Sequence, residues 1–97
     1  MATEFEWDPT KAAANLAKHG VAFEDASRVF ADINAIVALD RIADGEARWK
    51  AIGSVDRSIV LVVIHTTREE DDSEVIRIIS AREANRKEKR TYEDQNG

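Results

Sequence analysis

The chain has 97 residues, of which 43% are hydrophobic and 34% are charged, and it contains no cysteine. This length and composition predict one globular domain over residues 1–97 and exclude a disulfide framework or a thiolate metal site. The net charge of −5 argues against a general nucleic-acid binder, and the longest apolar run, residues 59–64, is too short to span a membrane. Because no signal-peptide pattern precedes the domain, we expect a cytoplasmic protein.

The N-terminal third predicts a strand followed by two helices. Apolar and acidic residues alternate over residues 4–7, which is the period of a half-buried strand. Asp8 followed by Pro9 is a typical helix start, and Gly20 is placed to end that helix in the left-handed conformation. Residues 23–30 carry apolar side chains at helical spacing and predict a second, short helix.

The rest of the chain predicts an antiparallel sheet and a final helix. Ser80 with Glu83 fits a capping box, so we expect the final helix to begin there and to end near Glu93. Turn composition over residues 40–46 and a run of four acidic residues at 69–72 predict two loops, the second a mobile hairpin loop. The resulting fold class is α+β, with a β meander between the N-terminal helices and the C-terminal helix. Four segments have strand composition: residues 35–39, 48–53, 59–66 and 75–79.

Positive charge is concentrated near the C-terminus. Residues 77–90 include six basic and two acidic residues, a net charge of +4. A helix from Ser80 has only three apolar residues to hold it on its domain, Ala81, Ala84 and Tyr92. Its basic stripe is either a solvated helix face or a surface that binds RNA phosphate, a partner protein or both. The stripe consists of Arg82, Arg86, Lys89 and Arg90.

Three residues outside this helix are candidates for chemistry. Arg77 lies in the middle of an apolar strand, so its guanidinium must either pair with a carboxylate on a neighbouring strand or bind phosphate on an open sheet face. His19 and His65 are the two histidines, and each can act as a general acid or base near neutral pH. His19 can instead satisfy carbonyls at a helix end, and His65 can be an ordinary strand-end residue. The two histidines offer no zinc-ligand spacing, and the acidic run at 69–72 is more typical of a solvated loop than of a cation site.

Several segments, in the same order along the chain, resemble the BrnT family of toxins. The acidic insert, residues 69–74, is longer than the usual turn of that family. The segments that carry the resemblance are residues 5–9 with Lys11, Asn15 and residues 18–21, then Phe23, Glu24 and Ala26, then Arg48, Trp49, Ile52 and Gly53, then His65, Thr66 and Arg68, and finally residues 77–82 with Ala84 and Glu88.

The resemblance implies a RelE-like fold and a metal-independent endoribonuclease that inhibits translation and needs no cofactor. It also implies a BrnA-type antitoxin as partner, RNA as substrate, and contact with operator DNA only through the toxin–antitoxin complex. The expected phosphate ligands are Arg68, Arg77 and Arg82, and His19 or His65 is the expected proton-transfer group. Further residues are expected to bind RNA (Lys18, Arg48, Arg86) or the partner (Arg86, Lys89, Arg90).

Two other functions fit the same residues. In one, the basic helix only docks a partner protein and no chemistry occurs. In the other, a toxin of the same fold acts on a protein target. The sequence leaves open which histidine transfers the proton, because a one-residue slip of a hairpin register changes the face on which a side chain lies.

Overall fold

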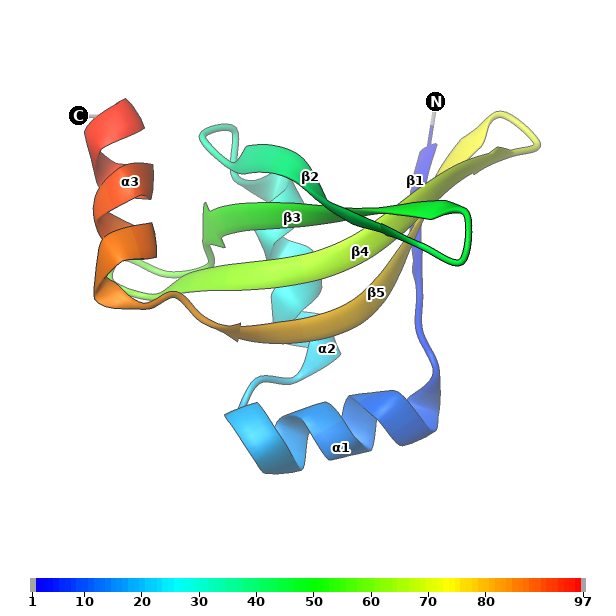
Figure 1. The fold of residues 1–97 in the computed structure, drawn as a ribbon, viewed down its shortest axis with the longest axis horizontal. Helices are drawn as coiled ribbons and strands as arrows, with labels where there is room; N and C mark the ends of the chain where they lie inside the picture. The colour runs from blue at the N-terminus through cyan, green and yellow to red at the C-terminus, as the bar shows by residue number, and fades with distance from the viewer. Residues whose placement is uncertain (1, 97) are drawn as a thin grey trace.

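The computed structural model describes residues 2–96, which form a curved sheet with the N-terminal helices on one face and the C-terminal helix at one end (Figure 1). This arrangement confirms the α+β class. In chain order the elements are β1 (Ala2–Glu6), α1 (Pro9–His19), α2 (Phe23–Ala26), the 3-10 helix η1 (Ser27–Ala31), β2 (Ile36–Ala43), β3 (Glu46–Ser54), β4 (Val60–Glu70), β5 (Ser73–Glu83) and α3 (Arg86–Asn96).

The sheet has the strand order β1-β5-β4-β3-β2. Strands β2 to β5 form the expected antiparallel meander, whereas β1 pairs in parallel with β5, with Glu6 opposite Arg77. The helices α1, α2 and η1 lie between β1 and β2 in the sequence, so β1 is joined to the rest of the sheet by a crossover and lies at its edge. This edge position brings the N-terminal strand beside the last strand.

Both hairpins close with two residues in the left-handed region. Asp44 and Gly45 have φ angles of 53° and 76°, and Asp71 and Asp72 have φ angles of 50° and 65°. Two successive positive φ angles are the mark of the turn that matches strand twist, and aspartate tolerates this conformation better than most residues. The predicted loops at 40–46 and 69–72 are therefore wrong in extent, because strand pairing continues up to each two-residue turn.

Helix α1 begins and ends where the sequence predicts. The Asp8 carboxylate accepts a 2.8 Å hydrogen bond from the Thr10 amide, and Pro9 occupies the first turn. Gly20 has a φ of 71° and donates its amide to the Leu16 carbonyl at 2.9 Å. Local capping chemistry thus sets both ends of this helix.

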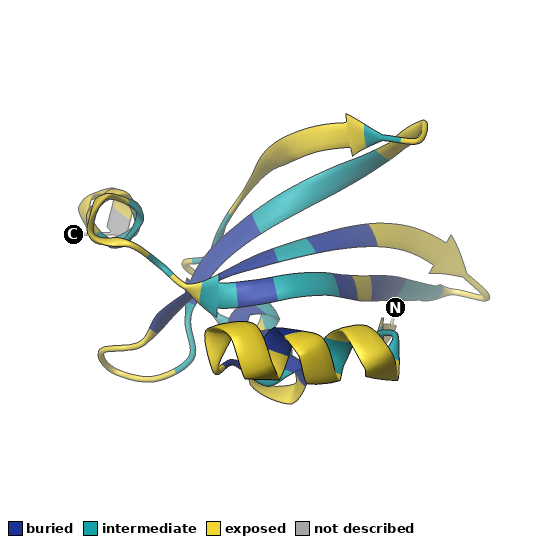
Figure 2. Ribbon diagram, turned by 60° about the horizontal axis from the view of Figure 1, so that its bottom comes forward, coloured by how far each residue is buried: buried dark blue, intermediate teal, exposed yellow. Residues whose placement is uncertain are grey.

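The core lies between the sheet and the N-terminal helices, and α1 exposes its outer side to solvent (Figure 2). Phe23 and Val29 from the helices pack with Val63 and Ile78 from the sheet, and all four are fully buried. Burial of this apolar surface is the main stabilising term of the fold.

Asn15 from α1 completes the edge of β5 beyond the end of β1. Its amide nitrogen donates to the carbonyls of Ala81 (2.8 Å) and Val21 (3.0 Å), and its amide oxygen accepts from the Ala81 amide at 3.1 Å. The Asn15 amide therefore replaces a neighbouring strand at a point where the pairing of β1 with β5, which ends at Arg77, no longer reaches.

The C-terminal helix begins six residues later than the sequence predicts. Residues 80–83 are strand residues paired with residues 61–64, and α3 begins at Arg86. Asn85 and Glu88 form the capping box: the Asn85 amide donates to Glu88 at 2.9 Å and the Glu88 amide donates to Asn85 at 2.8 Å. The predicted four-residue basic stripe is therefore wrong, because Arg82 lies on β5 and only Arg86, Lys89 and Arg90 lie on α3.

Tyr92 provides the main apolar contact between α3 and the sheet. Tyr92 packs on an apolar cluster of Ile52, Val60 and Val62, and its hydroxyl donates to Asp32 at 2.5 Å. Burial and the bond to Asp32 raise the pKa of Tyr92 to about 12. Tyr92 is thus the apolar anchor of α3, in line with the small number of apolar residues that the sequence offers there.

Candidate functional site

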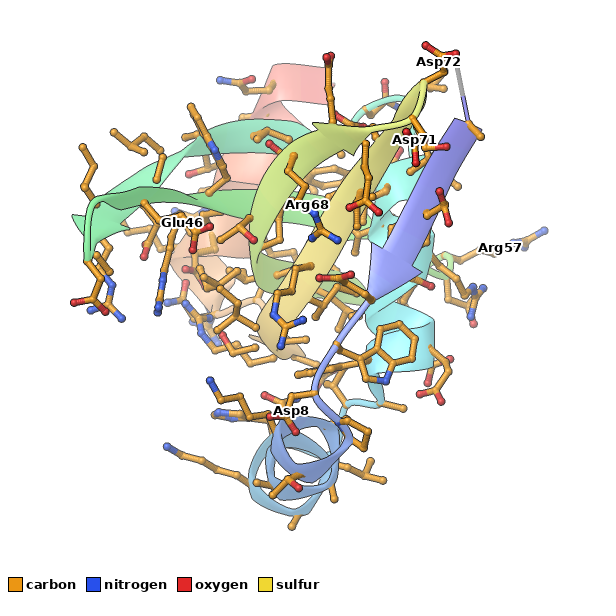
Figure 3. The ribbon with its side chains drawn as sticks, turned by 90° about the vertical axis from the view of Figure 1, so that its right-hand side faces the viewer. Asp8, Glu46, Arg57, Arg68, Asp71 and Asp72 are labelled. Carbon is orange, nitrogen blue, oxygen red and sulfur yellow. The ribbon has the colours of Figure 1, made fainter. Side chains whose placement is uncertain are left out.

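The candidate site lies on the face of the sheet opposite α1 and α2. Side chains of a strand alternate between faces, so Thr66 and Arg68 of β4 lie on this open face while His65 lies on the covered face. The β2–β3 and β4–β5 hairpins diverge toward their turns, so the sheet is curved (Figure 2). Arg68 lies on this face, and Asp71 and Asp72 lie at the tip of the β4–β5 hairpin (Figure 3).

Two predicted arginines meet at one carboxylate on the open face. Arg68 donates to Glu6 in a bidentate pair, with Nη1–Oε2 at 2.8 Å and Nη2–Oε1 at 2.9 Å, and its Nε donates to Glu70 at 3.1 Å. Arg77 donates from Nη1 to Oε2 of Glu6 at 3.0 Å. We call Glu6, Arg68 and Arg77 the arginine–glutamate cluster.

The cluster is accessible and strongly polarised. The side chains of Arg68, Arg77 and Glu6 are 46%, 44% and 34% exposed. Hydrogen bonds from Arg68 and then Arg77 lower the pKa of Glu6 to about 2, so its carboxylate is ionised at neutral pH. Arg77 therefore pairs with a carboxylate on the neighbouring strand, as one of the two alternatives predicts, and its side chain is also exposed on the open face. Phosphate binding by Arg77 stays a prediction.

Arg82 lies on β5 at the other end of the open face. It forms a bidentate pair with Glu88 of α3, with Nη1–Oε1 at 2.7 Å and Nη2–Oε2 at 2.9 Å. The side chain of Glu88 is only 16% exposed, and the bond from Arg82 lowers its pKa to about 2. Arg82 thus ties the start of α3 to the sheet as well as contributing charge to the open face.

The histidines lie far apart in the fold. His65 is 3% exposed on the covered face, where its ring meets the edge of Phe30 at a centroid distance of 4.8 Å. Burial lowers the pKa of His65, which favours the neutral ring. It lines an apolar groove of about 340 Å³ with Trp49, Phe30, Val37, Thr67, Glu74 and Ile76.

His19 ends α1 and is exposed beside Arg82. It lines a hollow of about 220 Å³ that also includes Lys50, Ser80 and Arg82. The structure therefore brings His19 to Arg82, groups Arg68 with Arg77, and leaves His65 on the other face of the sheet. Lys18 is exposed next to His19, and Arg48 is half-buried on β3 opposite Arg41.

The remaining predicted partner-binding residues lie on α3. Arg86 and Arg90 are exposed, and Lys89 is half-buried with its ammonium donating to the Ser58 carbonyl at 3.1 Å. Neither the position of Glu6 nor the structural role of Asn15 could be predicted from the sequence pattern. The alternation of residues 4–7 places Glu6 on the polar face of its strand. To predict that this face meets Arg77, one must know that β1 is the neighbour of β5.

Within residues 2–96, no three histidine, aspartate or glutamate side chains gather in a way that could hold a metal ion. No helix among these residues is long and apolar enough to cross a membrane.

Comparisons with known proteins agree on the class of protein. The 1.1 Å crystal structure of the Brucella abortus ribonuclease toxin BrnT matches 89% of this chain and 100% of its own, with a TM-score of 0.64 and 28% sequence identity. Residues 7–88 match the family described as "ribonuclease toxin, BrnT, of type II toxin–antitoxin system". Fold and sequence together define a ribonuclease toxin of a type II toxin–antitoxin system. Within that class, the chain belongs to the BrnT family, as the resemblance indicates. No curated protein sequence matches it.

Proposed function

We propose that this protein is a metal-independent endoribonuclease that cuts RNA in the cytoplasm by attack of a 2′-hydroxyl on the adjacent phosphate, and thereby blocks translation. The observation that carries the proposal is that Arg68 and Arg77 both contact one carboxylate, that of Glu6, on the open face of the sheet. Cleavage without a metal requires cations around the phosphorane, a base for the 2′-hydroxyl and an acid for the leaving oxygen. Planar guanidinium groups bind phosphate oxygens in pairs and so supply the cations.

The other predicted site residues extend this surface. Arg82, with His19 and Lys50 beside it, offers a second phosphate site toward α3. Lys18, Arg48 and Arg86 are proposed to bind the RNA backbone on either side. His19 and His65 remain candidate proton-transfer groups, and of the two only His19 is exposed beside a predicted phosphate ligand.

RNA cleavage by the free protein tests the proposal. The protein, purified without its antitoxin, should cut RNA in the presence of EDTA and leave 2′,3′-cyclic phosphate ends. Loss of cleavage in EDTA would instead show that the protein depends on a metal. RNA left intact by folded protein, with and without ribosomes, would favour a non-enzymatic binding module or a toxin with a protein target.

Arg57 provides a matched control for the arginine substitutions. It carries the same charge but lies in the β3–β4 connection and projects away from the sheet (Figure 3). Arg57→Ala should therefore leave cleavage unchanged, whereas Arg68→Ala should abolish most of it.

We further propose that a BrnA-type antitoxin covers α3 or the open face, through Arg86, Lys89 and Arg90, and that the complex alone contacts operator DNA. Family membership implies an antitoxin partner. An acidic antitoxin surface on α3 would lie next to the cations proposed to hold RNA, so binding and inhibition would be one event.

A further inference from the structure

Glu6 is the acidic member of the arginine–glutamate cluster. Glu6 lies between the two arginines proposed to hold the phosphate, at the end of an edge strand and on the open face. We propose that Glu6 is the general base that removes the proton from the attacking 2′-hydroxyl. This inference rests on the proposed ribonuclease function.

The geometry places base and phosphate ligands within one hydrogen-bond length of each other. Three guanidinium N–H groups donate to the Glu6 carboxylate at 2.8, 2.9 and 3.0 Å. A guanidinium has five N–H donors, and the bond from Arg77 to Glu6 uses one of them. A phosphate that binds those N–H groups of Arg68 and Arg77 that do not donate to Glu6 therefore lies beside the carboxylate. The 2′-hydroxyl of the adjacent ribose can then reach an Oε atom of Glu6.

Neither histidine is placed to do this work at the same phosphate. His65 is buried on the covered face, so the sheet separates it from Arg77. His19 lies at the other end of the open face, in the hollow with Arg82. Among the described residues, Glu6 is the proton acceptor that both arginines contact.

The basicity of the Glu6 carboxylate should increase when substrate binds. Its pKa of about 2 keeps it ionised in the free protein, and the same arginine bonds make it a weak base there. A bound phosphate takes over part of the hydrogen bonding from Arg68 and Arg77, which raises the pKa of Glu6 toward its ordinary value. The carboxylate therefore becomes more basic when a phosphate is in place.

The reaction balances with water as the only co-reactant. The O2′–H bond breaks and its proton moves to an Oε atom of Glu6 as the O2′–P bond forms. The P–O5′ bond breaks, and O5′ takes a proton from solvent water. Protonated Glu6 returns its proton to the hydroxide so formed. The products are a 2′,3′-cyclic phosphate and a 5′-hydroxyl end.

Single-turnover cleavage at saturating RNA tests this role. Glu6→Gln keeps the size and the acceptor oxygen of the side chain but cannot take a proton, so the rate should fall at least about 100-fold. Glu6→Asp should restore part of that rate. Glu4→Gln, an exposed glutamate on the same strand, is the matched control and should cut normally. Binding of a fully 2′-O-methylated RNA should be retained or tightened in Glu6→Gln, because the arginines lose a charged competitor.

A purely positioning role predicts a different pattern. If Glu6 only orients the arginines, Glu6→Gln weakens RNA binding but leaves the saturated rate unchanged, and that result overturns the proposal. The pH profile gives an independent check that needs no variant. With Glu6 as base the wild-type rate should be nearly constant between about pH 5.5 and pH 8, whereas a histidine base makes it fall about tenfold per unit below about pH 6.

The outcomes separate this inference from the proposed function. Wild-type protein that cuts RNA while Glu6→Gln cuts equally well overturns the role of Glu6 alone. Wild-type protein that cuts no RNA overturns both. If Glu6→Gln fails to fold, as judged by thermal unfolding, the wild-type pH profile and Glu6→Asp decide the matter.

Discussion

Replacing Arg77 with alanine separates a functional role from a structural one. Arg77 lies between the buried residues Ile76 and Ile78, yet its side chain is 44% exposed and donates one 3.0 Å hydrogen bond to Glu6. An ion pair as exposed as this contributes about 0–1 kcal/mol to stability. Glu6 also keeps both hydrogen bonds from Arg68 in the variant. We therefore expect the free energy of unfolding to fall by at most about 1 kcal/mol.

The expected loss of activity is several times larger. Removing one preorganised donor to a developing oxyanion costs roughly 100- to 1,000-fold in rate, or about 2.7–4 kcal/mol of transition-state stabilisation. Arg77→Lys should recover part of the rate, because it restores the charge but not the planar pair of donors. Single-turnover cleavage of labelled RNA gives the rates. Urea denaturation, followed by the fluorescence of Trp7 and Trp49, gives the stability.

Two results would contradict this role of Arg77. A loss of about 3 kcal/mol or more in stability would show that Arg77 acts as the partner of a buried ion pair. A folded Arg77→Ala variant that cuts within about tenfold of wild type would show that the guanidinium makes no essential contact with the reacting phosphate. Arg57→Ala, measured in parallel, controls for the general loss of positive charge.

Three further predictions concern the edge of β5, the start of α3 and its exposed face. Asn15→Ala should lower the free energy of unfolding, measured by urea denaturation, by about 3 kcal/mol, because it removes three hydrogen bonds of about 1 kcal/mol each. A loss no larger than that of the exposed control Lys11→Ala would show that the edge of β5 needs no partner. Glu88→Gln should reduce the fall in melting temperature between about pH 5 and pH 2. The pKa of Glu88 is lowered to about 2, so its carboxylate stabilises the fold above the ordinary pKa of glutamate and loses this effect as the pH falls. An unchanged pH profile would contradict the stabilising role of the Arg82–Glu88 ion pair. Reversing Arg86 and Arg90 to glutamate should slow association with the antitoxin and weaken the complex in surface plasmon resonance; an unchanged rate and affinity would show that the partner binds elsewhere.

Features that depend only on neighbouring residues could be predicted from the amino-acid sequence. Asp8 and Gly20 satisfy backbone groups within one helical turn, so both ends of α1 follow from local chemistry. The β-branched run that forms β4 predicts a central strand for a similar reason, since its side chains favour extended backbone and burial. The α+β class followed from the order of such elements, and family motifs spread along the chain added the class of protein.

The start of the final helix depends on long-range contacts that the sequence does not reveal. Ser80 with Glu83 and Asn85 with Glu88 offer similar capping boxes, and local propensity does not choose between them. Pairing with β4 and the Asn15 clamp at Ala81 hold residues 80–83 in the sheet, so the second box forms. Long-range hydrogen bonds of this kind outweigh a single capping interaction, which contributes about 1 kcal/mol.

The set of residues that meet at the candidate site likewise depends on how the strands pair. Residues 6 and 77 are 71 positions apart, and only the parallel pairing of β1 with β5 places Glu6 beside Arg77. A bulge between Ile64 and His65 and the register of the β4–β5 hairpin set the faces on which His65 and Arg77 lie. Because side chains alternate along a strand, a shift of one residue would exchange the faces, and no local pattern in the sequence reports that register.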